Sequence, residues 1–410
     1  MNILFISHRI PYPPNKGDKI RSFHILKYLA ERHSVYLACL IDAREDLENI
    51  GPLSNMTEEL YWEEINPAAK KTASLLYFGS HTPLSIPYFY AGRLQKRIDA
   101  LLDKTRMEAI FCFSSPTAEY VFRSRHYKND LQKATWCMDL IDMDSEKWHQ
   151  YALAGSVPMK WIYQREAKTL LAYEKRISRE FDSLLLVSKA ERDFFKTRVS
   201  ADNVIALSNG VDQVHFHPGF ASSLPKEGPS LVFTGAMDYR PNIEAVKWFT
   251  YNVLPKVRNK ITDVRFYIVG SKPGRDVKSL AREKGVHVIG YVNDVRDYIA
   301  MADVCVVPLH IARGLQNKVL EAMAMGRPVV CTSQAFEGIE ATPGEHLLTA
   351  DDAETFCQTI LDLLTDNKKA SQFGVRARKC IEANYSWPQN LAVLDGLLDR
   401  PPRKNRENEG

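Results

Sequence analysis

The sequence predicts an α/β protein built from two doubly wound domains, each on a parallel sheet. Short apolar runs alternate with segments of helical periodicity, which is typical of parallel strands joined by crossover helices. The alternation stops at residues 208–229, which are rich in Gly, Pro and Ser, and then begins again. A length of 410 residues also favours two or three domains over one.

The first series of elements ends near residue 207. Apolar runs such as NILFIS and AIFCF indicate strands that are buried on both faces. The expected strands are 2–7, 34–41, 109–113, 134–141, 183–188 and 204–207. The expected helices are about 18–31, 93–103, 144–153, 158–180 and 189–197.

The second series predicts a second sheet of the same kind. Its expected strands are 230–236, 264–271, 286–292, 303–309 and 328–333, and its expected helices are about 241–258, 275–284, 294–301, 315–325, 352–365 and 368–383. The predicted organisation is a first domain over 1–207, a linker over 208–229, a second domain over 230–385, a helix over 386–400 that packs back on the first domain, and a disordered tail over 401–410.

Composition excludes several classes of protein. The net charge is +4, from 54 basic and 50 acidic residues, which is too balanced for a nucleic-acid-binding protein. No apolar run is long enough to cross a membrane, and the N-terminus lacks the basic segment of a signal peptide. The seven cysteines are scattered, with no CxxC pair, which argues against a disulfide framework or a zinc site and favours a reducing compartment.

A loop, a helix and a strand follow one another in 312-ARGLQNKVLEAMAMGRPVV-330. Ligands of parallel sheets bind where strands end and helices begin, and the first N–H groups of a helix attract phosphate. Lys318 would add a positive charge there, and Glu321 lies on the same helical face, where its carboxylate suits the vicinal hydroxyls of a ribose. The alternative is that Glu321 simply pairs with Lys318 on a solvated surface.

This stretch resembles the signature of the family-4 retaining nucleotide-sugar glycosyltransferases, which have the GT-B fold. The matching residues are Glu321-Ala322-Met323-Ala324, Gly326, Pro328 and Val329-Val330. Further matches along the chain are Ser188, Asn209-Gly210-Val211-Asp212, Gly235, Gly270 and Gly290-Tyr291-Val292. The chain is also similar to the sugar transferases encoded with bacterial exopolysaccharide and exosortase (PEP-CTERM) systems, through the run from Arg313 to Glu321 and Pro-Tyr-Pro-Pro near the start.

The resemblance implies two Rossmann-like domains that face a cleft. It implies transfer of a sugar from a nucleoside diphosphate sugar to a hydroxyl, with retention of anomeric configuration and with no metal or other cofactor. The acceptor would be a glycan, presumed lipid-linked, in exopolysaccharide biosynthesis. The location implied is the cytoplasm, with peripheral contact at the inner face of the plasma membrane.

The resemblance also assigns donor-binding residues. Glu321 would bind the ribose, and Gly290, Tyr291 and Val292 would lie along the base. Two cations that usually hold the diphosphate are replaced by Ala236 and Pro241, so Arg240, Arg313 and Lys318 are the nearest substitutes. The remaining expected donor residues are Gly17 in the first domain and Gly314, Leu315, Gln316 and Asn317 at the helix tip.

Arg313 departs from the family pattern, in which a first Glu stands at this position. A guanidinium prefers a carboxylate or a phosphate, so the change favours a switched acceptor or diphosphate contact, or a uronic-acid donor. The kinetics of Arg313→Ala with neutral and acidic donor sugars would separate these hypotheses. The expected catalytic residues are Glu321, Lys318, Arg313 and Asp142.

The acceptor is expected on the first domain. His8 follows the first strand, and Lys19 and Arg21 lie in the first turns of the next helix, where they would hold an acceptor phosphate; a plain connecting loop is the alternative. Asp142 ends a strand and would face the acceptor, although Asp142-Met143-Asp144 only imitates a metal-binding DxD motif. Asp144 is expected to cap the following helix.

Two segments mix apolar and basic residues. These are 156–181 and 85–99, and either would suit contact with an anionic membrane or a solvated face at a domain edge. Two other functions also stay open: a nucleotide-sugar epimerase with the GT-B fold, which would need no acceptor, and a catalytically silent GT-B scaffold that binds a partner transferase.

Overall fold

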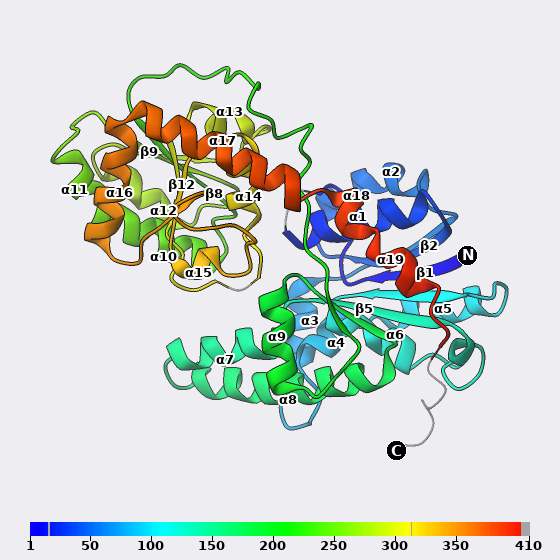
Figure 1. Ribbon diagram of the computed structural model, residues 1–410. Coiled ribbons are helices and arrows are strands. Elements are labelled where there is room, and N and C mark those ends of the chain that lie inside the picture. Colours follow the sequence, from blue (N-terminus) through cyan, green and yellow to red (C-terminus); the bar gives the residue numbers. More distant parts are fainter. Residues whose placement is uncertain (15–16, 313, 403–410) are drawn as a thin grey trace. The chain divides into compact units, whose positions relative to one another are not determined.

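The computed structural model describes residues 1–14, 17–312 and 314–402. The chain divides into two compact units (Figure 1). The first contains Met1–Leu207 and the chain from Leu391 onward, and the second contains Ser208–Asn390. Each unit holds one parallel sheet with helices packed around it, which confirms the predicted fold class.

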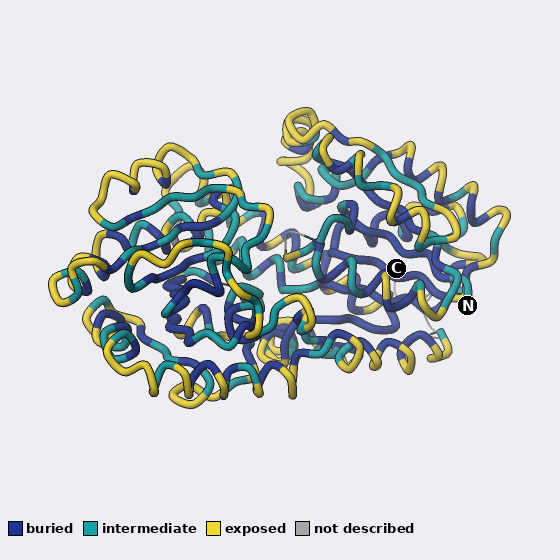
Figure 2. The backbone as a smooth tube through the Cα atoms, turned by 90° about the horizontal axis from the view of Figure 1, so that it is seen from above, coloured by how far each residue is buried: buried dark blue, intermediate teal, exposed yellow. Residues whose placement is uncertain are grey.

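The first unit is built on a seven-stranded parallel sheet. Its central strands are buried along almost their whole length (Figure 2), which explains why they read as continuous apolar runs. In spatial order the strands are β3 (Glu59–Glu64), β2 (Ser34–Ile41), β1 (Asn2–Ser7), β4 (Ala109–Phe113), β5 (Thr135–Ile141), β6 (Ser183–Leu186) and β7 (Val204–Ala206). The strand order reverses between β1 and β4, so a crevice for ligands is expected at the carboxyl ends of these two strands.

The edge strand β3 was not predicted. Its sequence is ELYWEE, and none of its residues is fully buried, so it lacks the apolar run of the inner strands. It forms because it pairs in parallel with β2, from Tyr36 and Glu59 to Ile41 and Glu64. The helices of this unit are α1 (Gly17–Ala30), α2 (Ile50–Ser54), α3 (Pro67–Leu75), α4 (Ser85–Phe89), α5 (Gly92–Leu102), α6 (Ala118–Phe122), α7 (Asp144–Ala154), α8 (Met159–Glu180), α9 (Lys189–Arg198) and α19 (Val393–Leu398).

The C-terminal segment packs on the first unit through α19. Asp395 accepts a hydrogen bond of 2.8 Å from the Tyr28 hydroxyl on α1. The Arg400 carbonyl accepts one of 2.6 Å from Thr135 at the start of β5. Most of the predicted tail, residues 403–410, lies outside the described residues.

The second unit is built on a six-stranded parallel sheet. In spatial order its strands are β10 (Val286–Gly290), β9 (Arg265–Val269), β8 (Ser230–Thr234), β11 (Val304–Val307), β12 (Val329–Cys331) and β13 (Leu348–Thr349). Here the order reverses between β8 and β11. Its helices are α10 (Arg240–Trp248), α11 (Leu254–Arg258), α12 (Arg275–Ser279), α13 (Arg296–Met301), α14 (Asn317–Ala324), α15 (Ser333–Phe336), α16 (Ala353–Thr365), α17 (Asn367–Asn384) and α18 (Trp387–Leu391).

Residues 208–229, expected as a linker, belong to the second unit. Val211 forms a β-bridge with Ser386, and its N–H donates to the Tyr385 carbonyl at 2.9 Å. Phe216 and Phe220 pack against the core of this unit. The segment is therefore held by apolar contacts that its Gly- and Pro-rich composition does not reveal.

No helix in the described part of the chain is long and apolar enough to cross a membrane.

A fully buried ion pair ties together three parts of the first unit. Arg21 on α1 donates to Asp139 on β5 at 2.7 Å and 3.2 Å, and neither side chain is exposed to solvent. The same guanidinium donates to the Leu207 carbonyl after β7 at 2.7 Å, and Asp139 also accepts from the Ile141 N–H at 2.9 Å. Each nitrogen of the guanidinium and both carboxylate oxygens thus have a hydrogen-bond partner, as burial of charge requires.

We expect Arg21→Met to lower the free energy of unfolding of the first unit by about 3–5 kcal/mol, because it leaves the Asp139 charge buried without a partner. Chemical denaturation would measure this. The double variant Arg21→Met/Asp139→Leu should recover part of the loss, and Arg44→Met, which removes an exposed pair with Glu64, should change little. Equal effects of the Arg21 and Arg44 variants would contradict the assignment.

Candidate functional site

Three glycines lie side by side at the carboxyl edge of the second sheet. Gly235, Gly270 and Gly290 end β8, β9 and β10, with φ angles of 153°, 154° and 81° that favour glycine. The Gly235 N–H donates to the Val269 carbonyl at 2.9 Å, and the Gly270 N–H donates to the Gly290 carbonyl at 2.8 Å. A Cβ on Gly270 would stand 1.7 Å from the Gly235 carbonyl oxygen, so this close approach requires glycine. The row leaves backbone bare at the edge where ligands bind.

The ammonium group of Lys318 lies beside this row. It donates to Asn242 Oδ1 at 2.6 Å and lies 4.5 Å from the centroid of the Phe233 ring. Asn242 is itself oriented, because its Nδ2 donates to the Ala236 carbonyl at 2.9 Å. A Cβ on Gly235 would come within 3.0 Å of the Lys318 nitrogen. Helix α14 and the loop after β8 therefore bring one cation to the glycine row.

Glu321 lies one turn further along α14 and does not pair with Lys318. Within the described chain its carboxylate makes no hydrogen bond or ion pair, whereas the Lys318 ammonium bonds to Asn242. The surface-pair alternative for Glu321 is therefore wrong. Burial raises the pKa of Glu321 to about 7 and lowers the pKa of Lys318 to about 7, and the attraction between the two charges only partly opposes both shifts. Both groups would gain from a ligand that offers opposite charge or hydroxyl donors.

The tip of α14 begins at Asn317, later in the chain than predicted, because Gln316 has an extended backbone and takes the N-cap position. Its side chain makes no capping bond, so the first-turn N–H groups are not satisfied by the cap residue. The Asn209 Nδ2 atom donates a hydrogen bond of 3.1 Å to Asn317 Oδ1. The backbone carbonyl of Asn209 accepts one from Asn390 Nδ2. Asn209 and Asn242 thus support the helix tip and Lys318, and neither was predicted as a site residue.

The other predicted donor residues take different positions. Gly314 has φ 66°, Leu315 packs partly on the core, and Gln316 Nε2 donates to the Gly314 carbonyl at 3.3 Å. Tyr291 is 71% exposed, next to Val292, which packs on the core. Arg240 is exposed in the first turn of α10. Arg313 lies outside the described residues.

At the carboxyl edge of the first sheet, His8 follows β1. Its Nε2 lies 3.5 Å from Asp18 Oδ2, and its ring stacks on Phe113 with centroids 5.9 Å apart. Its Nδ1 atom is buried with no hydrogen-bond partner among the described residues. Burial would raise the pKa of Asp18, but the hydrogen bond from His8 and the charge of Arg9 bring it well below its ordinary value.

Lys19 and Arg21 do not present free cations for an acceptor phosphate. Both lie in α1, which begins at Gly17, and both point into the protein. The Lys19 ammonium is buried and bonds to Asp46 at 2.7 Å, and Arg21 belongs to the buried pair with Asp139. The expectation was wrong because carboxylates on two other elements, Asp46 in the segment after β2 and Asp139 on β5, neutralise the two cations inside the protein.

Asp142 also has an unpartnered polar atom at this edge. Its Oδ1 atom is buried with no hydrogen bond among the described residues. Burial raises the pKa of Asp142 to about 7, and the nearby Glu191 carboxylate adds to the shift. Asp144 does not cap α7 as predicted: it is the first helical residue, Met143 takes the N-cap position, and Asp144 Oδ2 accepts from the Ser115 hydroxyl at 3.3 Å.

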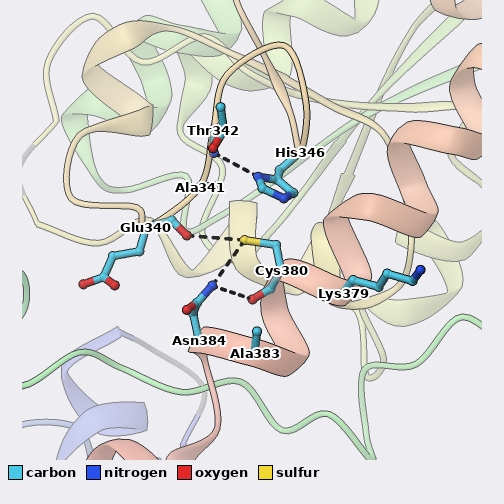
Figure 3. Close-up of a pocket in the computed structure, with 8 residues that line it drawn as sticks. All are labelled: Glu340, Ala341, Thr342, His346, Lys379, Cys380, Ala383 and Asn384. Carbon is cyan, nitrogen blue, oxygen red and sulfur yellow. Dashed lines mark hydrogen bonds between the residues drawn. The ribbon is translucent and has the colours of Figure 1, made fainter.

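Neither a metal-binding cluster nor the surface hollow at α17 contains the predicted site residues in the described part of the chain. Among the described residues, no group of three or more His, Cys, Asp or Glu side chains could hold a metal ion. A surface hollow lies between the C-terminal part of α17 and the 340–346 loop (Figure 3), and its volume is about 370 Å³. None of the predicted site residues lines this hollow, and its Cys380 thiol bonds to the Glu340 carbonyl.

Comparison with known proteins agrees with this geometry. Residues 228–366, the segment that carries the glycine row, Lys318 and Glu321, match the family Glycosyl transferases group 1. The matched segment lies within the second unit. The match agrees with the glycosyltransferase resemblance of the sequence, at the level of this broader family.

Two relatives and two solved structures extend the similarity beyond this domain. The chain is 21% identical over 397 residues to an uncharacterized 44.6 kDa protein in the cps region of Klebsiella pneumoniae, covering 93% of this chain and 96% of that one. It is 25% identical over 252 residues to a GDP-mannose-dependent monoacylated alpha-(1-6)-phosphatidylinositol monomannoside mannosyltransferase of Corynebacterium glutamicum, covering 56% of this chain and 65% of that one.

Both solved structures share the fold over 97% of this chain. The sucrose-phosphate synthase of Thermosynechococcus elongatus has a TM-score of 0.72 at 19% identity, with 98% of its chain covered. The Anabaena protein Alr3699/HepE, in complex with UDP, has a TM-score of 0.65 at 15% identity, with 99% of its chain covered. The fold is therefore GT-B, with two Rossmann-like units.

We expect Gly270→Ala to destabilise the second unit by about 1–3 kcal/mol or more, because the added methyl group meets the Gly235 carbonyl. Thermal unfolding would measure this. Gly274→Ala is the matched control, since a Cβ at Gly274 meets nothing within 4 Å and the backbone there has φ −70°. Equal midpoints for the two variants would contradict the close approach.

The pKa of Lys318 predicts a pH dependence for anion binding. The ammonium is charged below its pKa of about 7, and a bound diphosphate raises that pKa, so the contribution of Lys318 to nucleoside diphosphate affinity should be greatest below pH 7 and fall as pH rises above it. Calorimetry from about pH 6 to about pH 9 would measure this. Lys318→Arg keeps its charge throughout this range and should bind with a flatter profile; an unchanged slope would show that another group titrates.

Proposed function

We propose that this protein is a retaining glycosyltransferase that moves a sugar from a nucleoside diphosphate sugar to a hydroxyl of a glycan acceptor. The observation that carries the proposal is the position of the Lys318 ammonium, beside the bare backbone of Gly235 and on the same helix as the unpaired Glu321. Lys318 and the N-terminus of α14 would bind the phosphates, and the Glu321 carboxylate would bind the ribose. The segment from Gly290 to Val292 would lie along the base.

The proposed chemistry depends on stabilising the leaving group. As the bond between the sugar and the diphosphate breaks, negative charge grows on the diphosphate oxygens, and Lys318, the N-terminus of α14, Arg240 and Arg313 are the groups proposed to neutralise it. The transition state is oxocarbenium-like and needs no strong protein nucleophile. In this scheme the departing phosphate receives the proton of the acceptor hydroxyl, and no metal takes part.

Asp142 is the proposed acceptor contact in the first unit. A buried carboxyl oxygen without a partner is costly, and a hydroxyl donor from the acceptor would satisfy it. His8 is proposed beside it, because its Nδ1 atom is also unsatisfied. Gly17, at the start of α1, remains a proposed point of approach for donor phosphate.

The relatives support a role in surface polysaccharide synthesis. One is encoded in a cps region, and another transfers mannose from GDP-mannose to a phosphatidylinositol mannoside, as their names state. By analogy we propose a lipid-linked acceptor and a cytoplasmic protein held at the inner face of the plasma membrane. The similar Anabaena structure contains UDP, so the base of the donor has to be tested directly.

The test is thermal stability with UDP, GDP, ADP and NAD, each in excess. A ligand at 100 times its dissociation constant stabilises the unit that binds it by about 2.7 kcal/mol. We expect one nucleoside diphosphate to raise the unfolding midpoint. We expect Glu321→Ala to lower the affinity for that nucleotide by about tenfold to a hundredfold, because charge-assisted hydrogen bonds to the ribose are lost.

Glu354→Ala is the control, since Glu354 is an exposed carboxylate at the start of α16 in the same unit. A shift with no nucleotide would favour a silent scaffold. Nucleotide binding with turnover of the donor into an isomer, without any acceptor, would favour an epimerase.

A further inference from the structure

Large apolar side chains are exposed on two segments of the first unit that are far apart in the sequence. The first segment is the end of α3 and the following turn, where Leu76 is 87% exposed. The second runs from the end of α7 through the connection to the first turn of α8, where Trp161 is 63% exposed. The other exposed members are Leu75, Tyr77 and Phe78 in the first segment and Leu153, Val157 and Met159 in the second.

Arg165 and Glu166 on α8 hold these two segments together. Arg165 donates four hydrogen bonds of 2.7–2.9 Å to carbonyl oxygens of the turn after α3, at Tyr77, Phe78, Ser80 and Thr82. Glu166 accepts from the N–H groups of Leu84 and Ser85 at 2.9 Å and 3.2 Å. The two exposed apolar segments are therefore joined through α8, and we call them together the α3/α8 patch.

The two segments of the α3/α8 patch carry basic residues and no carboxylate. Residues 65–84 and 150–165, which together contain the whole patch, include no Asp or Glu. Their Lys and Arg residues are Lys70, Lys71, Lys160 and Arg165. Glu166, the acid that follows, is buried. Two segments that expose large apolar side chains thus lack acidic residues, in a chain with 54 basic and 50 acidic residues.

We infer that the α3/α8 patch docks the protein on an anionic phospholipid bilayer. Leucine, valine and methionine side chains would enter the acyl boundary, Trp161 and Tyr77 suit the interface, and the lysines would meet lipid phosphates. The absence of carboxylates favours this occupant, because any acid in the patch would be repelled by the same headgroups. The inference deepens the proposed function by naming the surface, and it rests on that function only for the identity of a lipid-linked acceptor.

This surface differs from the two segments that sequence patterns suggested. The apolar side chains in the middle of α8 pack inward, since Leu170, Tyr173 and Ile177 are buried, and its exposed large apolar side chains lie in the first turn. Segment 85–99 is also largely internal, with Ile86, Leu94 and Ile98 buried. The turn after α3 replaces it as the partner of the α8 N-terminus.

The test is flotation of the full chain with vesicles of phosphatidylcholine alone or with phosphatidylglycerol. We expect binding to the anionic vesicles, and we expect Leu76→Glu/Trp161→Glu to lower that affinity by about tenfold or more, because two apolar anchors are replaced by charges that anionic lipid repels. Val375→Glu is the matched control, since Val375 on α17 is 54% exposed in the second unit.

Failure of the wild type to float with anionic vesicles, or equal flotation of the two glutamate variants, would overturn the inference. So would a concentration-dependent dimer that Leu76→Glu/Trp161→Glu abolishes, which would assign the patch to a second copy of the chain. Thermal unfolding checks that each variant folds, and nucleotide binding measured on the same samples tests the proposed function separately.

Discussion

The second unit depends on the close approach of two loops at the carboxyl edge of its sheet. Gly270 lies against the carbonyl of Gly235 at a distance that no side chain would allow. This contact aligns the ends of β8, β9 and β10 and keeps their edge free of side chains. The Lys318 ammonium reaches the edge for the same reason, since even a methyl group on Gly235 would crowd it. The absence of side chains at Gly235 and Gly270 therefore shapes the site as much as the side chain of Lys318 does.

The ionisable groups of Lys318 and Glu321 are buried and do not pair with each other. The Lys318 ammonium contacts the Phe233 ring and the Asn242 amide oxygen, and Glu321 is a nearby carboxylate. Burial lowers the pKa of Lys318 and raises the pKa of Glu321, which favours the neutral form of each group. Neutral forms avoid most of the cost of desolvation, but they are poor partners for phosphate and ribose. A bound diphosphate would restore the charge on Lys318, so ligand binding and protonation should be coupled.

The first unit contains buried polar groups that are paired with a partner and others that are not. Arg21 with Asp139, and Lys19 with Asp46, are neutralised inside the protein and stabilise the arrangement of α1, β5 and the loop after β2. Asp142 and His8 each keep an unsatisfied buried atom at the carboxyl edge. Unsatisfied buried groups are rare because they are costly, so their presence at the edge where parallel sheets bind ligands is best explained by a function.

The sequence by itself determined the fold class, since buried parallel strands require continuous apolar runs, and these are visible without any tertiary information. It also identified Lys318 and Glu321, because helical spacing and strand-end position are local properties. Only the tertiary structure decided which charges are available. Arg21 and Lys19 have the same local signature as a phosphate site, and their carboxylate partners Asp139 and Asp46 lie on other elements. Asn242 and Asn209 were missed for the same reason: side-chain contacts across the fold are set by packing, which no local pattern records.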